Sequence, residues 1–325
     1  MKRWVIGYDG HKQQEIAKIT SWKTTAVTNM KGNPVYQFDE IPCGKCIECR
    51  LKYAKTWATR CMLEAREYEH NEMLTLTYDE EHVPTNTGID VKTGEIKQVQ
   101  TLVKKDVQDF LKRLRKAIKS PIRYFMCGEY GSQNGRPHYH LIMYNLNVED
   151  KQRQGINKKG HETFTSATIE KIWGKGRIDL QPVTYESCEY VARYVLKKQK
   201  GAEAKETYSD RGQIPEYTCM SRKPGIAYKY YERKKETINE TQKIWLQTKK
   251  TLKAVAPPRY FDKLLEKEDF EKLQEIKQKR KELAMFKERE QRIETPLSRE
   301  EILLKHQGVL QNQTNKFDRQ YERGA

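Results

Sequence analysis

Residues 122–144 read IRYFMCGEYGSQNGRPHYHLIMY, two runs of strand-forming residues around a segment rich in turn formers. The segment from Gly131 to Pro137 contains the glycine, asparagine and proline residues that favour a reversal of the chain. We therefore predict a β-hairpin whose two strands cover Ile122–Glu129 and His138–Tyr144.

The second of these strands carries a His-Tyr-His triplet. Side chains two residues apart on a strand point to the same side, so His138 and His140 would present their imidazoles together while Tyr139 faces the other way. Two imidazoles at this spacing suit a divalent metal ion, and Glu129 on the neighbouring strand could add a carboxylate oxygen. This ligand set favours Mg²⁺ or Mn²⁺ with positions left for water and phosphate oxygens. A His-x-His pair also occurs as plain decoration of a strand, and the residues alone leave both interpretations open.

A second motif lies in a helix predicted from Tyr185 to Gln199, where residues 188–198 read CEYVARYVLKK. At about 100° per residue, Tyr190, Arg193, Tyr194 and Lys197 share one arc, and apolar residues occupy the opposite side. Each tyrosine is followed three residues later by a cation, which favours the phenolate and neutralises charge on a reacting phosphate. A tyrosine oxygen can attack a phosphodiester and keep the bond energy in a phosphotyrosine. An ordinary amphipathic helix with tyrosines at its rim is the competing interpretation.

The remaining patterns predict further elements around these two motifs. Apolar periodicity indicates helices over 47–69 and 102–118, and a run of β-formers indicates a strand over Met73–Tyr78. Residues 84–98 contain a proline and two glycines among polar residues, so we expect a loop there. Short strands and turns are expected over 1–42. A charged helical tail is expected over 257–325, beginning with Pro257-Pro258.

The charge of the chain is strongly positive and unevenly spread. The formal net charge is +17, and residues 259–325 contribute only +2 of it, with 16 basic and 14 acidic residues. A basic body of this kind indicates a polyanionic partner. The sequence has no apolar run long enough to span a membrane, so we expect no membrane partner. Basic residues interleaved with tyrosines between 197 and 235 favour contact with single-stranded DNA, and a solvated charged face is the alternative. Four candidate DNA-binding residues are Arg193, Lys198, Arg222 and Lys223.

Three of the seven cysteines crowd together as Cys43, Cys46 and Cys49. Structural zinc takes four ligands, so this cluster would supply three and need a fourth from elsewhere. A reduced cluster at the start of a helix is an equally open interpretation.

Together these segments resemble the HUH endonuclease superfamily, and more narrowly the replication-initiator (gene A-type) proteins of microviruses. The match to the His-hydrophobic-His motif is Arg136-Pro137-His138-Tyr139-His140, and residues 190–198 resemble the two-tyrosine motif of the initiator branch. The run from Leu74 to Asp79 resembles the first conserved strand, and residues 43–50 resemble a cysteine-rich entry segment. The resemblance covers roughly residues 43–230. Arg193 departs from it, because a lysine is common at this position in relatives.

The resemblance implies an α+β fold with an HUH/RRM-like central antiparallel sheet, flanking helices and a C-terminal helical tail. A nicking domain would then occupy 43–256. It also implies a metal-dependent nick at a phage origin, with Tyr190 and Tyr194 as nucleophiles and Lys197 assisting. A 5′-phosphotyrosine would form and the freed 3′ end would prime rolling-circle synthesis. The sequence holds no Gly-x-x-x-x-Gly-Lys-[Ser/Thr] motif, so a host helicase would have to unwind the duplex. The resemblance also implies a host polymerase as partner and the cytoplasm of a bacterial host cell as the location.

Two alternatives remain at this level. Within the enzymes, a transposase or a plasmid relaxase of the same superfamily would use the same motifs. From another class, a non-enzymatic, zinc-containing nucleic-acid-binding protein would use the basic surface and the cysteines alone.

Overall fold

The computed structural model falls into two compact units, residues 1–50 and 51–325. It describes the following residues: 27–28, 34–35, 47–89, 93–131, 135–157, 160–197, 208, 212–248, 251–295, 297, 301, 304–305, 308–309 and 312. In the first unit, strand β1 (Val27–Thr28) pairs with β2 (Pro34–Val35) in antiparallel fashion. The rest of the predicted N-terminal segment, together with Cys43, Cys46 and Lys198, lies outside the described residues.

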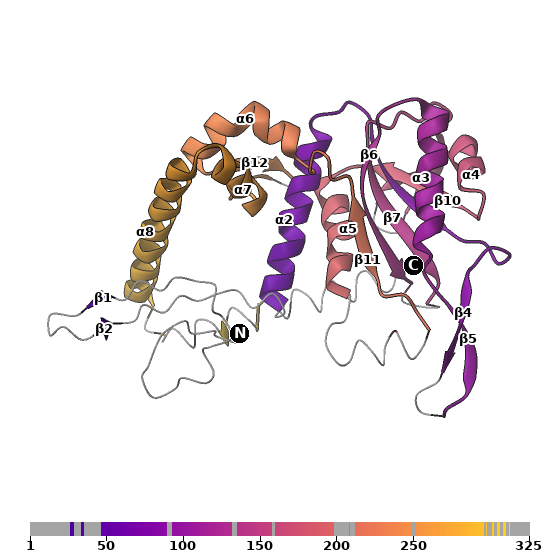
Figure 1. Ribbon diagram of the computed structural model, residues 1–325, viewed down its shortest axis with the longest axis horizontal. Coiled ribbons are helices and arrows are strands. Elements are labelled where there is room, and N and C mark those ends of the chain that lie inside the picture. Colours follow the sequence, from indigo (N-terminus) through magenta and orange to yellow (C-terminus); the bar gives the residue numbers. More distant parts are fainter. Residues whose placement is uncertain are drawn as a thin grey trace. The chain divides into compact units, whose positions relative to one another are not determined.

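The second unit is built on a seven-stranded antiparallel sheet in the order β11-β6-β7-β3-β10-β9-β8 (Figure 1). Its strands are β3 (Asn71–Thr77), β6 (Arg123–Tyr130), β7 (Pro137–Tyr144), β8 (Gln152–Ile156), β9 (Glu162–Thr165), β10 (Ile178–Pro182) and β11 (Tyr217–Met220). The predicted hairpin is confirmed as β6 and β7, which occupy the middle of the sheet beside β3. The sheet confirms the expected α+β fold with a central antiparallel sheet and flanking helices.

One face of the sheet is covered by α3 (Lys104–Ile118) and α4 (Ala167–Trp173), as Figure 1 shows on the right of the sheet. The predicted stripe of α3 is confirmed, because Val107, Phe110, Leu111 and Leu114 are all buried there. These side chains pack on the alternate residues of β3 and β7 that point to this face, including Leu76 and Tyr139.

The other face is covered by α2 (Ile47–Ala65) and α5 (Tyr185–Lys197), on the left of the sheet in Figure 1. The small side chains of α2, such as Ala54 and Ala58, let this helix approach the sheet closely and are buried against it. Helix α5 packs on β6, β7 and β11. Because β6 and β7 carry the acid–histidine motif, this packing brings the tyrosine helix onto the strands of the predicted metal site.

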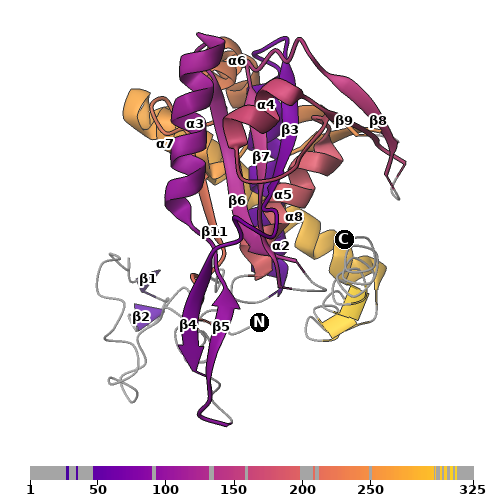
Figure 2. The ribbon, with the colours of Figure 1, turned by 90° about the vertical axis from the view of Figure 1, so that its right-hand side faces the viewer.

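Residues 84–98 were expected to form a loop, and this prediction is wrong. They belong to an antiparallel ribbon of β4 (Thr85–Ile89) and β5 (Ile96–Gln100), which extends beyond the sheet in Figure 2. Most of its side chains are exposed, so it shows no apolar alternation from which to predict it. A distant segment supports it, since Asn86 donates to the carbonyl of Gly212 and Gln213 donates to the carbonyl of Gln100.

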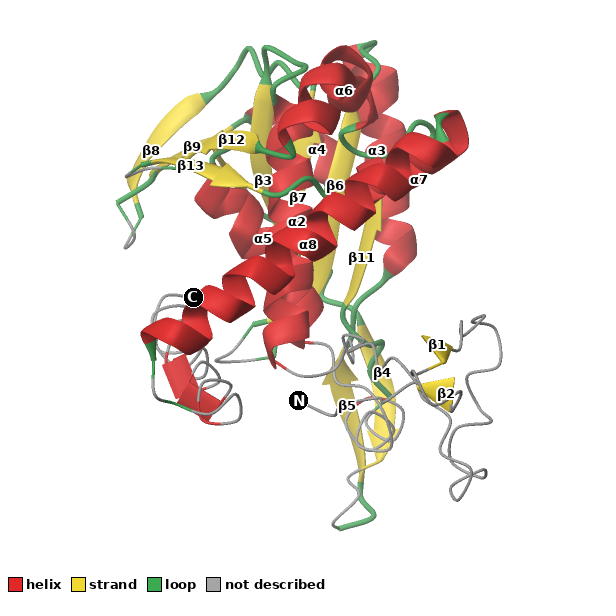
Figure 3. Ribbon diagram, turned by 90° about the vertical axis from the view of Figure 1, so that its left-hand side faces the viewer, coloured by secondary structure: helices red, strands yellow, loops and turns green. Residues whose placement is uncertain are grey.

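The C-terminal part adds α6 (Tyr228–Thr241), the hairpin β12 (Ile244–Gln247) and β13 (Leu252–Val255), and helices α7 (Arg259–Glu268) and α8 (Phe270–Glu294) (Figure 3). Helix α7 packs on the body through Phe261, which shares a buried cluster with Tyr231 and Ile244. No helix among the described residues is long and apolar enough to cross a membrane.

A buried ion pair ties α2 to the sheet and to the start of α6. The Glu64 carboxylate, with only 1% of its side chain exposed, accepts from Arg123 Nε on β6 and from the backbone amide of Ala227. Ala227 caps α6 with a positive φ of 69°, so Glu64 also stabilises an uncommon backbone conformation.

Replacing Glu64 with alanine is expected to lower the free energy of unfolding by about 3–5 kcal/mol, because it leaves the Arg123 charge buried without its partner. Urea unfolding followed by circular dichroism measures the change. The matched control is Glu162→Ala, whose pair with Arg153 is more than half exposed on both sides and should contribute at most about 1 kcal/mol. Equal losses in the two variants would contradict the structural role given to Glu64.

Candidate metal centre and tyrosine helix

The β6–β7 hairpin places the acid and the two histidines side by side. Glu129 on β6 lies directly opposite His138 on β7, and His140 lies two residues beyond His138 on β7. Strand alternation puts all three side chains on the α2 and α5 face, whereas Tyr139 is fully buried on the α3 face. The predicted arrangement of this motif is therefore confirmed.

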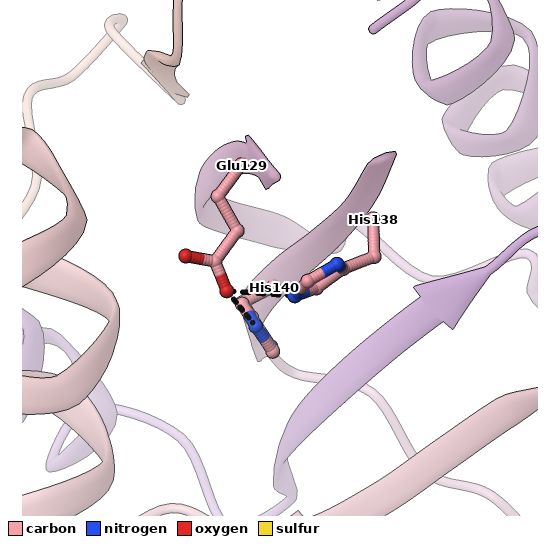
Figure 4. A group of neighbouring side chains, drawn as sticks. All are labelled: Glu129, His138 and His140. Atoms are coloured by element: carbon pink, nitrogen blue, oxygen red, sulfur yellow. Dashed lines mark hydrogen bonds and ion pairs between the residues drawn. The ribbon is translucent and has the colours of Figure 1, made fainter. Parts of the chain in front are cut away.

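The three side chains converge on one carboxylate oxygen (Figure 4). Glu129 Oε1 lies 2.7 Å from His138 Nε2 and 2.9 Å from His140 Nε2. The two imidazole rings are perpendicular, with their centroids 4.9 Å apart. One potential ligand atom from each residue lies within 4.8 Å of the others. Within the described part of the chain, this is the one group of three histidine, cysteine or acidic residues that meets this condition.

The second ring nitrogen of each histidine, Nδ1, also lies within hydrogen-bond distance of a partner. His138 Nδ1 lies 3.0 Å from the carbonyl oxygen of Arg136, and since a carbonyl only accepts, Nδ1 must carry the hydrogen. His140 Nδ1 lies 3.0 Å from Thr75 Oγ1 on β3. Metal-binding histidines typically donate their second N–H to such an acceptor, which orients the ring and leaves Nε2 to the metal.

Glu129 is ionised in this setting. Burial by itself raises the pKa of this carboxyl, but the hydrogen bonds from His138 and His140, together with their charge, bring its pKa down to about 2. A buried carboxylate is stable only with a positive partner, here either protonated histidine or a cation.

The residues present fit a divalent cation. A neutral His138 with its hydrogen on Nδ1 directs the Nε2 lone pair at Glu129 Oε1, 2.7 Å away. Two lone pairs can lie this close only with a proton or a cation between them. Two imidazole nitrogens and one carboxylate oxygen from one side leave the remaining positions of an octahedral ion open to water or substrate oxygens.

Tyr190 lies next to this group. Helix α5 buries Cys188, Val191 and Ala192 against the sheet, as predicted, and holds Tyr190 half-buried at the edge of that cluster. The Tyr190 ring is edge-on to the His140 imidazole, with centroids 5.2 Å apart and an interplanar angle of 77°. The structure thus brings together two motifs that are 50 residues apart in the chain.

The other predicted residues of this helix are placed less completely. Tyr194 and Lys197 belong to α5, but their side chains lie outside the described part. The Arg193 guanidinium forms an ion pair with Glu189 at 2.9 Å, and both side chains are mostly buried. A contact of Arg193 with DNA would therefore have to share this guanidinium with Glu189.

The remaining candidates belong to other elements of the chain. Arg222 and Lys223 are exposed in the turn between β11 and α6. Cys49 is half-exposed in the first turn of α2, and its two predicted co-ligands lie outside the described residues. The structure therefore gives no test of the zinc interpretation.

The comparisons with known proteins identify the family of this chain. Residues 71–199 match the family model for the ORF2 type of replication-associated protein. The chain is 34% identical over 253 residues to Replication-associated protein ORF2 of Spiroplasma virus 4, covering 76% of this chain and 74% of that protein. The chain belongs to the ORF2 family of replication-associated proteins.

Two further relatives come from other bacterial viruses. This replication-associated protein is 33% identical over 187 residues to Replication-associated protein VP4 of Bdellovibrio phage phiMH2K, covering 52% of this chain and 55% of the relative. It is 31% identical over 166 residues to Replication-associated protein ORF4 of Chlamydia phage 1, covering 49% of this chain and 38% of the relative. No solved structure matches the chain. The resemblance to microvirus replication proteins is thereby confirmed.

The family match extends from the first residue of β3 through α5. It therefore contains Glu129, the two histidines, and both Tyr190 and Tyr194 of α5. It also contains Thr75, a site neighbour that sequence reasoning did not single out. Alternation puts Thr75 on a defined face of its strand, but only the pairing of β3 with β7 shows that it lies opposite His140.

Proposed function

We propose that this protein nicks single-stranded DNA at a phage replication origin through a tyrosine nucleophile and later rejoins the ends. The observation that carries this proposal is the position of Tyr190, whose ring packs on the His140 imidazole of the Glu129–His138–His140 group. A phenol beside a cation site is the arrangement that a phosphotyrosine intermediate requires.

Glu129, His138 and His140 would hold Mg²⁺ or Mn²⁺. When bound, the ion would polarise a non-bridging oxygen of the scissile phosphate and orient it. The protein supplies the orientation, because both histidines have a hydrogen-bond partner at Nδ1, which leaves Nε2 to the ion.

In the cleavage step, the tyrosine oxygen attacks phosphorus and the bond from phosphorus to the 3′ oxygen breaks. The phenol loses its proton to solvent or a nearby base, and the departing 3′ oxygen takes up a proton. The 5′ phosphate stays on the tyrosine, so the energy of the phosphodiester is retained for rejoining. Tyr194, one helical turn from Tyr190, would take over in a second transfer that closes the displaced circle, and Lys197 would stabilise the negative charge.

Replication-associated proteins act on DNA, and the positive excess of this chain lies in its first 258 residues. We assign Arg193, Lys198, Arg222 and Lys223 to contacts with the phosphates of the single strand. A host helicase and a host polymerase would complete replication inside the bacterial cell. Structural zinc at Cys43, Cys46 and Cys49 belongs to the same proposal.

The phosphate contacts predict a salt effect. The double variant Arg222→Ala/Lys223→Ala is expected to reduce the slope of log affinity against log salt by about 1.4, since each phosphate contact on a single strand contributes roughly 0.7. Fluorescence anisotropy with a labelled single strand at several salt concentrations measures this slope. Lys277→Ala, at an exposed position of α8, is the control and should leave the slope unchanged. An unchanged slope in the double variant would show that Arg222 and Lys223 do not contact the phosphates of the DNA.

The direct test of the proposed function is detection of a covalent adduct. The purified chain is incubated with single-stranded circular phage DNA and Mn²⁺, and the products are separated under denaturing conditions. We expect a protein–DNA adduct that resists denaturant and maps by mass spectrometry to a tyrosine of α5. The adduct should not form when a chelator is present during the incubation. DNA that is nicked without an adduct, or bound without a nick, would contradict the proposal.

A further inference from the structure

The two histidines of the metal centre are held by different kinds of group. His138 Nδ1 donates to a backbone carbonyl of its own strand, that of Arg136. His140 Nδ1 instead meets a side chain of the neighbouring strand, Thr75 Oγ1, at 3.0 Å. The orientation of His138 is therefore set by the backbone, whereas that of His140 depends on a hydroxyl that a substitution can remove.

Thr75 is placed by the sheet itself. It lies directly opposite His140 in the β3–β7 ladder, and both side chains point to the α2 and α5 face. On the reverse face Leu74 and Leu76 are fully buried, and Tyr78 Oη lies 3.0 Å from Tyr139 Oη. Contacts on both faces thus fix β3 to the histidine strand, so the Thr75 hydroxyl stays within hydrogen-bond distance of His140 Nδ1.

We propose that Thr75 is a positioning residue of the metal centre, whose hydroxyl accepts the Nδ1–H of His140 and thereby directs the Nε2 lone pair to the bound cation. The inference rests on the proposed function, because it assumes that the group binds a metal. It gives a role to the Leu-Thr-Leu-Thr segment of β3, to which the proposed cleavage step assigns no task.

The physical reason lies in the freedom of an imidazole ring. Without an acceptor at Nδ1, the ring can rotate and can carry its hydrogen on Nε2, the atom that must be bare to bind a metal. Loss of such an outer partner typically weakens metal binding by about 10–100-fold. Tyr190 packs on the same ring, so the orientation of His140 also defines the position of the phenol relative to the cation.

The chain offers a matched control on the same strand and face. Thr77 lies opposite His138 just as Thr75 lies opposite His140. Since the carbonyl of Arg136 already serves His138 Nδ1, the Thr77 hydroxyl is not needed for that ring. Valine has nearly the shape of threonine, so Thr75→Val and Thr77→Val remove one hydroxyl each from comparable positions.

The test is a titration of the full chain with Mn²⁺, without DNA, followed by the electron paramagnetic resonance signal of free Mn²⁺. We expect Thr75→Val to weaken Mn²⁺ binding at least about 10-fold, and Thr75→Ser and Thr77→Val to bind like the wild type. Thermal unfolding of the metal-free variants checks that the fold is kept.

The outcomes separate this inference from the proposed function. A wild-type protein that binds no Mn²⁺ at this group overturns the proposed metal centre and the role of Thr75 with it. A wild type that binds Mn²⁺ while Thr75→Val binds equally well overturns the role of Thr75 alone. If Thr75→Val does not fold, nitrogen NMR of the wild type with Mg²⁺ decides: hydrogen on Nδ1 of His140 supports the proposal, and hydrogen on Nε2 overturns it.

Discussion

Replacing both Tyr190 and Tyr194 with phenylalanine is expected to abolish the covalent protein–DNA adduct and to lower origin nicking at least about 10⁴-fold, the scale seen when a covalent nucleophile is removed. Phenylalanine keeps the ring that packs on His140 but lacks the attacking oxygen. The fold and the affinity for single-stranded DNA should therefore change little. Denaturing gels with a labelled origin strand, in the presence of Mn²⁺, measure nick and adduct together.

The single variants divide the roles of the two tyrosines. Because the Tyr190 ring is the one that the structure places on His140, Tyr190→Phe alone should reduce the first nick on a linear strand. Tyr194→Phe should spare that nick and impair closure of the circle. Tyr185→Phe is the matched control, since this tyrosine of the same helix packs in the buried cluster against α2. An adduct that persists in the double variant would show that the nucleophile is neither Tyr190 nor Tyr194.

The second large effect concerns the proposed metal centre. His140→Ala and Glu129→Gln are each expected to weaken Mn²⁺ binding at least about 100-fold, because loss of a direct ligand should exceed the loss of an outer partner. Nicking should fall with it, whereas DNA affinity should remain. Calorimetric titration with Mn²⁺ and the nicking assay measure the two effects separately.

A surface histidine provides the control for this prediction. His82 is exposed and pairs with Asp79, so His82→Ala should bind Mn²⁺ and cut DNA like the wild type. Chelator should inactivate the wild type, and added Mn²⁺ should restore it but not His140→Ala. Full nicking by His140→Ala or His138→Ala would show that the reaction does not depend on a metal ion held by these histidines.

Much of the site could be predicted from the sequence because its parts are local. A period of two places His138 and His140 on one side of a strand, and the short turn before them brings Glu129 alongside. A period of 3.6 separates the buried face of α5 from the face with Tyr190. Each pattern lies within one hairpin or one helix, so local backbone geometry alone relates its members.

The parts that could not be predicted depend on contacts between distant segments. The β4–β5 ribbon has no apolar alternation, and its strand character comes from backbone pairing and from the 212–213 segment. Glu64 resembles any other helical glutamate in the sequence, and only its burial and its contacts with Arg123 and Ala227 distinguish it.

The sequence by itself determined the two chemical motifs, the antiparallel hairpin and the positive charge of the body, since each follows from local periodicity or composition. Only the tertiary structure decided that Tyr190 meets His140, because α5 must first pack on β6 and β7. It also decided that Thr75 lies against His140, because strand register depends on how the whole sheet pairs. The group of Glu129, His138 and His140 could be predicted from the hairpin, whereas the contacts of Tyr190 and Thr75 with His140 depend on packing.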